Sequence, residues 1–210
     1  MISFYTVLVP RIKYIIGIDE AGRGPVAGAV SVGAVLIPAR FDWAPWQGVR
    51  DSKQLTALAR ERWYGRIAEA QNGGGLRYSV SFTGSSQIDR GGIVPAIRAA
   101  LARSLLKLET DPFECLVLLD GSLKAPEEYR FQRTIIRGDQ LEPVISLASI
   151  VAKVSRDRQM VQLAKKYPLY GFESHKGYGT RQHYASIKKH GLCAIHRESF
   201  LSSLELSESL

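Results

Sequence analysis

The sequence is poor in cysteine and contains no long apolar run. Two cysteines among 210 residues, Cys115 and Cys193, are too few for the disulfide framework of a small secreted domain. Cys115 lies in an apolar run typical of a buried strand, so we interpret it as a core residue and expect a reducing, cytoplasmic location. No run approaches the roughly 20 apolar residues of a membrane-spanning helix, which predicts a protein without membrane association.

The first ten residues are apolar but lack the basic start and the small-residue cleavage site of a signal peptide. We interpret segment 1–10 as an extra N-terminal segment, which could form an edge strand.

Acidic residues are fewer than basic ones. The chain has 20 Asp and Glu against 28 Lys and Arg, a net charge of +8, and 45% hydrophobic residues. This composition is that of a globular protein, and the charge favours a polyanionic partner such as a nucleic acid. A generically basic protein is the alternative that charge alone leaves open. The length predicts one domain, or one domain with an appendage.

Histidine is also scarce. The pair Cys193 and His196 has no matching second pair, so the sequence does not resemble a closed four-ligand zinc site. The region 167–181 is instead rich in aromatic and basic residues, which fits either a nucleic-acid surface or the core of a small helical cap. Within it, Tyr178 should be exposed, because Gly177 and Gly179 flank it.

Two adjacent carboxylates, Asp19 and Glu20, follow the apolar run 14–18, which predicts a buried strand. Acids in such a position are costly unless they are paired or bind a metal. Glycines at 22 and 24 would let the backbone approach a ligand closely. The combination suggests metal-assisted phosphate chemistry.

Two further acids fit the same pattern. Asp120 ends a second apolar run, 114–119, and Asp157 shares one face of a predicted helix with Ile150, Val154 and Val161. We expect these acids to converge with Asp19 at one edge of a sheet. The alternatives are a turn former at Asp120 and, at Asp157, a salt bridge to a neighbouring Lys or Arg.

Patterning along the chain predicts a mixed α/β sheet. An antiparallel meander is expected from strands at 14–18, 28–37 and 76–82, and parallel additions from strands ending at 120 and at 134–137. Helices are expected at 56–71, 93–108, 141–166 and 180–190. We predict a catalytic domain over 1–166 and a C-terminal helical extension over 167–210.

A dinucleotide-binding fingerprint at 22–27 is rejected by its context. That motif must open a helix, whereas the run after Pro25 predicts a second strand.

Long stretches of the chain resemble the ribonuclease HII family, over residues 14–201. The matching stretches are GIDEAGRGP at 17–25, DSKQL at 51–55, LDG at 119–121, RGD at 137–139, ASIVAKVSRD at 148–157, HKGYGT at 175–180 and HRESF at 196–200. Arg137 stands where the family often has Lys. The Gly-Arg-Gly stretch favours type 2 over the related type 3 enzymes.

The resemblance implies a ribonuclease H-like fold and a metal-dependent endonuclease. The enzyme would cut the RNA strand of RNA–DNA hybrids and cut 5′ of ribonucleotides embedded in duplex DNA, leaving 5′-phosphate and 3′-hydroxyl ends. By resemblance, Asp19, Glu20, Asp120 and Asp157 would hold two Mg²⁺ or Mn²⁺ ions. Hard cations of this kind prefer oxygen ligands.

The resemblance also implies how the substrate is recognised. Gly22, Arg23 and Gly24 would bind the ribose 2′-hydroxyl through backbone atoms, and Tyr178 would stack on the deoxyribose beyond it. Lys53 and Lys176 are candidates for phosphate contacts. For Asp19 and Glu20 both to reach metal, the chain should leave strand geometry near Glu20.

The sequence leaves two alternatives: a non-catalytic hybrid-binding module, and a type 1 or type 3 nuclease of the same fold. We expect a monomer.

Overall fold

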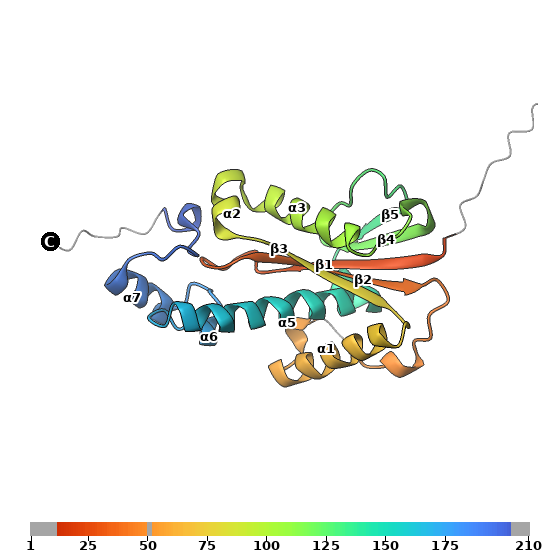
Figure 1. Cartoon of the computed structure of the whole chain (residues 1–210), viewed down its shortest axis with the longest axis horizontal. Coiled ribbons are helices and arrows are strands. Elements are labelled where there is room, and N and C mark those ends of the chain that lie inside the picture. Colours follow the sequence, from red (N-terminus) through yellow and green to blue (C-terminus); the bar gives the residue numbers. More distant parts are fainter. Residues whose placement is uncertain (1–11, 50–51, 203–210) are drawn as a thin grey trace, which may run out of the picture.

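The computed structural model describes residues 12–49 and 52–202, which form a five-stranded mixed sheet between two layers of helices (Figure 1). The strands are β1 (Tyr14–Ala21), β2 (Val30–Pro38), β3 (Arg77–Thr83), β4 (Cys115–Asp120) and β5 (Gln132–Ile135), in the order β3-β2-β1-β4-β5. β1, β2 and β3 pair antiparallel, and β4 and β5 add on parallel to β1. The predicted meander with parallel additions is confirmed.

The helices separate onto the two faces of the sheet and one end of it (Figure 1). α2 (Ser85–Gly91) and α3 (Ile93–Leu106) lie on one face, and α1 (Ala57–Asn72) and α5 (Pro143–Lys166) lie on the other. The short α4 (Gly138–Leu141) precedes α5, and α6 (Phe172–His175) and α7 (Arg181–His190) follow it.

Alternation along β1 explains why both faces are covered. Ile16 and Ile18 are fully buried in the cluster that contains Leu101 of α3. On the opposite face, the helix α5 lies directly on the backbone, because a Cβ at Gly17 would sit 2.3 Å from the Val144 carbonyl oxygen. β1 is therefore the central strand, with the apolar cluster that includes Leu101 on one face and α5 on the other.

The predicted element boundaries need three corrections. The short strand expected at 134–137 is β5, which ends at Ile135, because Arg137 adopts a left-handed turn with φ 56°. The helix expected from 141 begins at Pro143, and α4 precedes it. Helix α2 was not predicted, since Ile88 is its only apolar residue.

The C-terminal elements pack on the far end of α5. Their core contains Phe172 and Ile187 together with Met160 of α5 and Val26 and Ala27 of the turn before β2. The domain boundary at 166/167 stays a prediction, and the interpretation of segment 1–10 falls outside the described residues.

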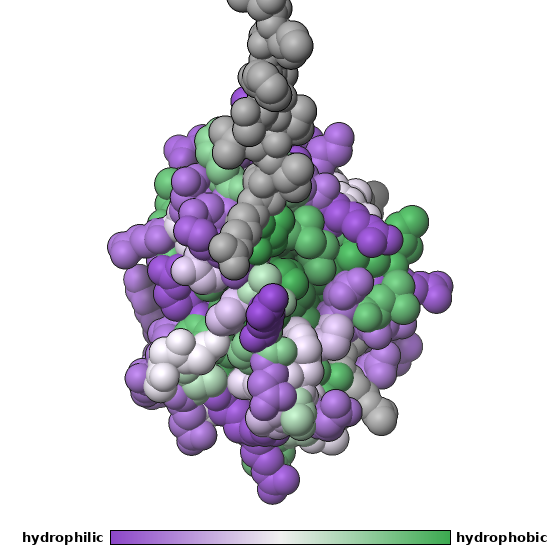
Figure 2. Space-filling view, turned by 90° about the vertical axis from the view of Figure 1, so that its right-hand side faces the viewer, coloured by the Kyte–Doolittle hydropathy of each residue, from purple (hydrophilic) through white to green (hydrophobic). Residues whose placement is uncertain are grey.

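The end of the molecule opposite α7 carries mostly hydrophilic side chains around a smaller apolar area (Figure 2). Within the described ranges, no helix is both long enough and apolar enough to cross a membrane.

Candidate active site

The end of β1 carries Asp19, which is 3% exposed, and Glu20, which is half-buried. The strand continues regularly through Ala21, with Glu20 opposite Val32 and Ala21 opposite Ser31. The chain leaves strand geometry at Gly22, with φ +90°. The Glu20 N–H donates to Asp19 Oδ1 at 2.7 Å.

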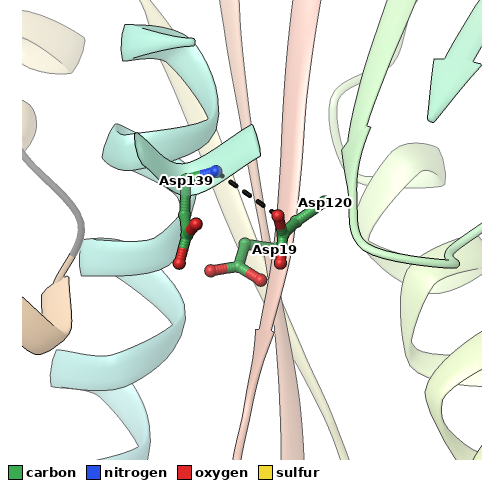
Figure 3. A group of neighbouring side chains, drawn as sticks. All are labelled: Asp19, Asp120 and Asp139. Atoms are coloured by element: carbon green, nitrogen blue, oxygen red, sulfur yellow. Dashed lines mark hydrogen bonds between the residues drawn. The ribbon is translucent and has the colours of Figure 1, made fainter. Parts of the chain in front are cut away.

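Asp120 and Asp139 join Asp19 from neighbouring elements (Figure 3). Asp120 ends β4, whose Leu119 pairs with Ile18 of β1, so the two acids end adjacent parallel strands. Asp139 comes from α4, and its N–H donates to Asp120 Oδ1 at 3.4 Å. Carboxylate oxygens of the three acids lie within 4.8 Å of one another. Three acids thus converge at one edge of the sheet.

Burial and mutual repulsion act on these acids. Burial raises the pKa of Asp19 well above its usual value, and the charges of Glu20 and Asp120 raise it further, while a hydrogen bond from the Ser149 side chain lowers it. Burial and the charge of Asp120 also raise the pKa of Glu20, and Arg23 lowers it. A bound divalent cation would offset both the burial of the charged carboxylates and the repulsion between them.

The oxygen-only donor set suits a hard divalent ion such as Mg²⁺ or Mn²⁺. Among the described residues, Asp19, Asp120 and Asp139 form the one group of three acidic, histidine or cysteine side chains close enough to share an ion. The group fits the metal chemistry that the sequence suggests.

Asp139 was missed as a site residue although its signal is present. It follows the short strand β5, just as Asp19 and Asp120 lie at the ends of apolar runs. Asp139 is 3% exposed and Lys53 Nζ lies 3.2 Å from its Oδ2. The structure therefore places Lys53 beside the acids. Its neighbour Asp51 lies outside the described residues.

Asp157 does not belong to this group. Its Oδ1 accepts from Lys153 Nζ at 2.8 Å, one turn away on α5, which agrees with the alternative prediction of a salt bridge to a neighbouring Lys or Arg. Asp157 lies on the same face of α5 as Ile150, Val154 and Val161. This face is buried only at its start, because Ile150 and Val154 are buried whereas Val161 is 37% exposed. The third acid beside Asp19 and Asp120 is Asp139.

The Gly22–Gly24 loop rests on two buried guanidinium groups. Arg197 donates to the carbonyls of Gly22 and Arg23, and a Cβ at Gly22 would lie 2.0 Å from Arg156 Nε. The Arg23 side chain reaches back to Glu20, with 3.5 Å between Nη1 and Oε1. A side chain at position 22 would displace the loop from its support.

Some aromatic residues of region 167–181 are core residues, and one is exposed as a nucleic-acid surface would require. Tyr170 and Phe172 are core residues of the C-terminal elements, whereas Tyr178 is 44% exposed, as expected. The Tyr178 ring lies over the amino end of Lys153 and the guanidinium of Arg156, at 5.7 and 5.9 Å from its centroid. Nearby Lys176 donates its ammonium to the carbonyl of Glu173 in its own turn.

Comparison with known proteins decides the family. The profile described as Ribonuclease HII matches residues 16–203. The chain belongs to the ribonuclease HII family. It is 45% identical to the ribonuclease HII of Endomicrobium trichonymphae over 184 residues, 88% of this chain and 83% of that protein. It is 43% identical to that of Caldicellulosiruptor bescii over 192 residues, 91% and 88% of the two chains.

Solved structures share the fold. A structure of the PCNA:RNase HII complex from Archaeoglobus fulgidus matches with a TM-score of 0.74 at 23% identity, covering 93% of this chain and 98% of that one. The ribonuclease H2 of Pyrococcus horikoshii OT3 matches with a TM-score of 0.70 at 24% identity, covering 93% and 97%. The predicted ribonuclease H-like fold is confirmed.

Family membership confirms the endoribonuclease activity predicted by the resemblance. The enzyme is a hydrolase, an endoribonuclease of the ribonuclease H type, and its family acts on RNA–DNA hybrids with divalent metal ions. The rival interpretation as a non-catalytic binding module is therefore wrong.

Proposed function

We propose that the enzyme cuts 5′ of a single ribonucleotide embedded in duplex DNA, in addition to the RNA strand of longer hybrids. The observation that carries this proposal is the position of the Gly22–Gly24 loop. It begins two residues after Glu20, and its Arg23 and Gly24 N–H groups have no acceptor among the described residues. Donors beside the carboxylates can bind a 2′-hydroxyl without reading the base.

Asp19, Glu20, Asp120 and Asp139 would hold two divalent ions, Mg²⁺ or Mn²⁺, with Asp139 in place of Asp157 as the fourth ligand. When bound, such ions polarise the scissile phosphate and activate water. The protein itself would orient the phosphate, with Lys53 beside the carboxylates and Lys176 farther along the substrate. Cleavage would leave 5′-phosphate and 3′-hydroxyl ends.

Tyr178 would stack on the deoxyribose that follows the ribonucleotide. Its exposed ring lies against the cationic groups of Lys153 and Arg156, which supports a role in contacting substrate over a role in core packing. We further propose a monomer of cytoplasmic location, whose cysteines are both free.

The test is single-turnover cleavage of three DNA duplexes that differ in one strand: one ribonucleotide, continuous RNA, and DNA throughout. Each is incubated with Mg²⁺, with Mn²⁺ and with EDTA. The proposal expects a cut 5′ of the single ribonucleotide with either metal and no cut with EDTA. Cleavage of continuous hybrid alone would overturn it.

A further inference from the structure

Residues 196 and 197 form a short segment that runs beside the turn preceding β2. His196 pairs with Ala27 in an isolated antiparallel bridge, and the Arg197 N–H donates to the Val26 carbonyl at 2.8 Å. Both side chains are buried, with 3% and 0% exposed. Their hydrogen bonds reach the two elements that the proposed function assigns to junction recognition.

Arg197 holds the Gly22–Gly24 loop by its carbonyls. Its Nη2 donates to Gly22 O at 2.7 Å and its Nη1 to Arg23 O at 3.0 Å, while Nε donates to Gly28 O at 2.9 Å. In a trans peptide the N–H points opposite to the C=O. The N–H groups of Arg23 and Gly24 therefore point away from the guanidinium.

The guanidinium has no carboxylate partner among the described residues. Burial and the neighbouring Arg156 lower the pKa of Arg197 to about 9. Burying a charge supported only by carbonyls is expensive, and apolar packing would fill the space at lower cost. The planar guanidinium of Arg197 instead fixes the orientation of several peptide groups, because its donors bind several carbonyls at once.

His196 holds the Tyr178 backbone through His183. His196 Nδ1 accepts from the Cys193 N–H at 2.8 Å, so the proton of the neutral ring is on Nε2. His196 Nε2 then donates to His183 Nε2 at 3.1 Å, which leaves the His183 proton on Nδ1. His183 Nδ1 donates to the Tyr178 carbonyl at 2.9 Å. The tautomers follow from the partners.

We infer that segment 196–197 is a positioning element that sets the Arg23 and Gly24 N–H groups and the Tyr178 ring at a fixed separation, and so determines the preference for a ribonucleotide–deoxyribonucleotide junction. The inference rests on the proposed function. Two recognition elements far apart in the sequence need a common support if one must bind a ribose and the other its neighbour. The adjacent residues His196 and Arg197 provide this common support.

Two substitutions test the two arms of the segment. Arg197→Lys keeps the charge but loses the planar fork, and His196→Phe keeps a ring but loses the donor to His183. Arg103→Lys is the matched control, because Arg103 likewise donates to a carbonyl, that of Phe82, and to Thr83 Oγ1, at 2.8 and 2.7 Å. It ties α3 to β3 and touches neither recognition element.

The measurement is the ratio of single-turnover rates on the one-ribonucleotide duplex and on continuous hybrid, together with thermal unfolding of each variant. Displacements of about 1 Å can cost on the order of a hundredfold in rate, so we expect the ratio to fall about tenfold or more in Arg197→Lys and His196→Phe. Arg103→Lys should lower the melting temperature and keep the wild-type ratio.

Combination with Tyr178→Ala separates positioning from stability. If the segment aligns Tyr178 with the loop, Tyr178→Ala should reduce the ratio less in the Arg197→Lys background than in the wild type. Ratios that stay within about twofold of the wild type in folded variants would overturn the inference and leave the proposed function standing. Failure of both variants to fold would also overturn it, because the segment would then be structural support. A wild type without junction preference would instead remove the proposed function.

Discussion

At the scale of single residues, the structure concentrates unfavourable electrostatics on Asp19. It is 3% exposed, and its pKa is raised by burial and by the charges of Glu20 and Asp120. A carboxyl group whose pKa is higher in the folded than in the unfolded protein binds more protons when folded. Without metal, its contribution to stability is therefore present at low pH and is lost as pH rises above 3.8 through the folded-state pKa.

Replacement of Asp19 by Asn should abolish cleavage, because it removes a metal ligand at nearly constant volume. The same change should raise the melting temperature at neutral pH in EDTA, since the buried charge is removed. Calorimetry with EDTA and with Mg²⁺ checks the second part, and single-turnover kinetics the first. Wild-type turnover in Asp19→Asn would contradict the assignment.

Tyr178 gives a second test at this scale. Tyr178→Ala should weaken cleavage at a single ribonucleotide by the equivalent of roughly 1–3 kcal/mol, the range for aromatic stacking on nucleic acid. Tyr178→Phe should keep most activity, because the ring face remains. Continuous hybrid presents a ribose to the ring, so the alanine variant should also lose the preference for the junction. An unchanged preference would leave recognition to the Gly22–Gly24 loop alone.

At the scale of elements, short patterns predicted the strands, the long helices and the convergence of Asp19 with Asp120, but not which further acid joins them. Periodicity correctly placed Ile150 and Val154 on the buried face of α5. It could not show that this face leaves the core before Val161, because that depends on where the sheet beneath the helix ends. Asp157 therefore lies outside the group formed by Asp19, Asp120 and Asp139. Asp139 was overlooked because its position depends on the left-handed turn at Arg137.

His183 of α7 and His196, which follows α7, make this region sensitive to acid. Burial lowers the pKa of His183 to about 4, and burial also lowers the pKa of His196. The folded state therefore binds fewer protons than the unfolded state. The contribution of these neutral histidines to the free energy of unfolding is fully present above about pH 6.5 and is lost as pH falls toward about 4. Protonation of His183 would also place an N–H on its Nε2, facing the N–H on Nε2 of His196, so the hydrogen bond between the two rings would be lost.

This acid sensitivity should depend on His183 itself. His183→Gln should flatten the pH dependence of the free energy of unfolding between pH 6.5 and 4.5, by an amount on the order of 2–3 kcal/mol. His190→Gln is the control, because His190 is exposed at the end of α7. Urea unfolding at several pH values measures the effect. Parallel profiles for wild type and His183→Gln would contradict it.

At the scale of the whole molecule, the net charge of +8 predicts binding that depends steeply on salt. Each phosphate contact on B-DNA contributes about −0.9 to the log–log slope of affinity against salt concentration. Lys176→Ala should reduce the slope by about one on every duplex sequence. Fluorescence anisotropy of a labelled duplex in EDTA from low to moderate salt measures it. An unchanged slope would mean that Lys176 only caps its own turn, where its ammonium already meets the Glu173 carbonyl.

The most direct test of the central claim compares two acids that differ in place but not in chemistry. Asp139→Asn and Asp157→Asn are assayed for single-turnover cleavage of the one-ribonucleotide duplex in Mg²⁺ and in Mn²⁺, with thermal unfolding as a check on folding. Asp139 lies with Asp19 and Asp120, whereas Asp157 pairs with Lys153. We therefore predict that Asp139→Asn loses cleavage and Asp157→Asn keeps most of it. Loss in Asp157→Asn with activity kept in Asp139→Asn would contradict the active site described above.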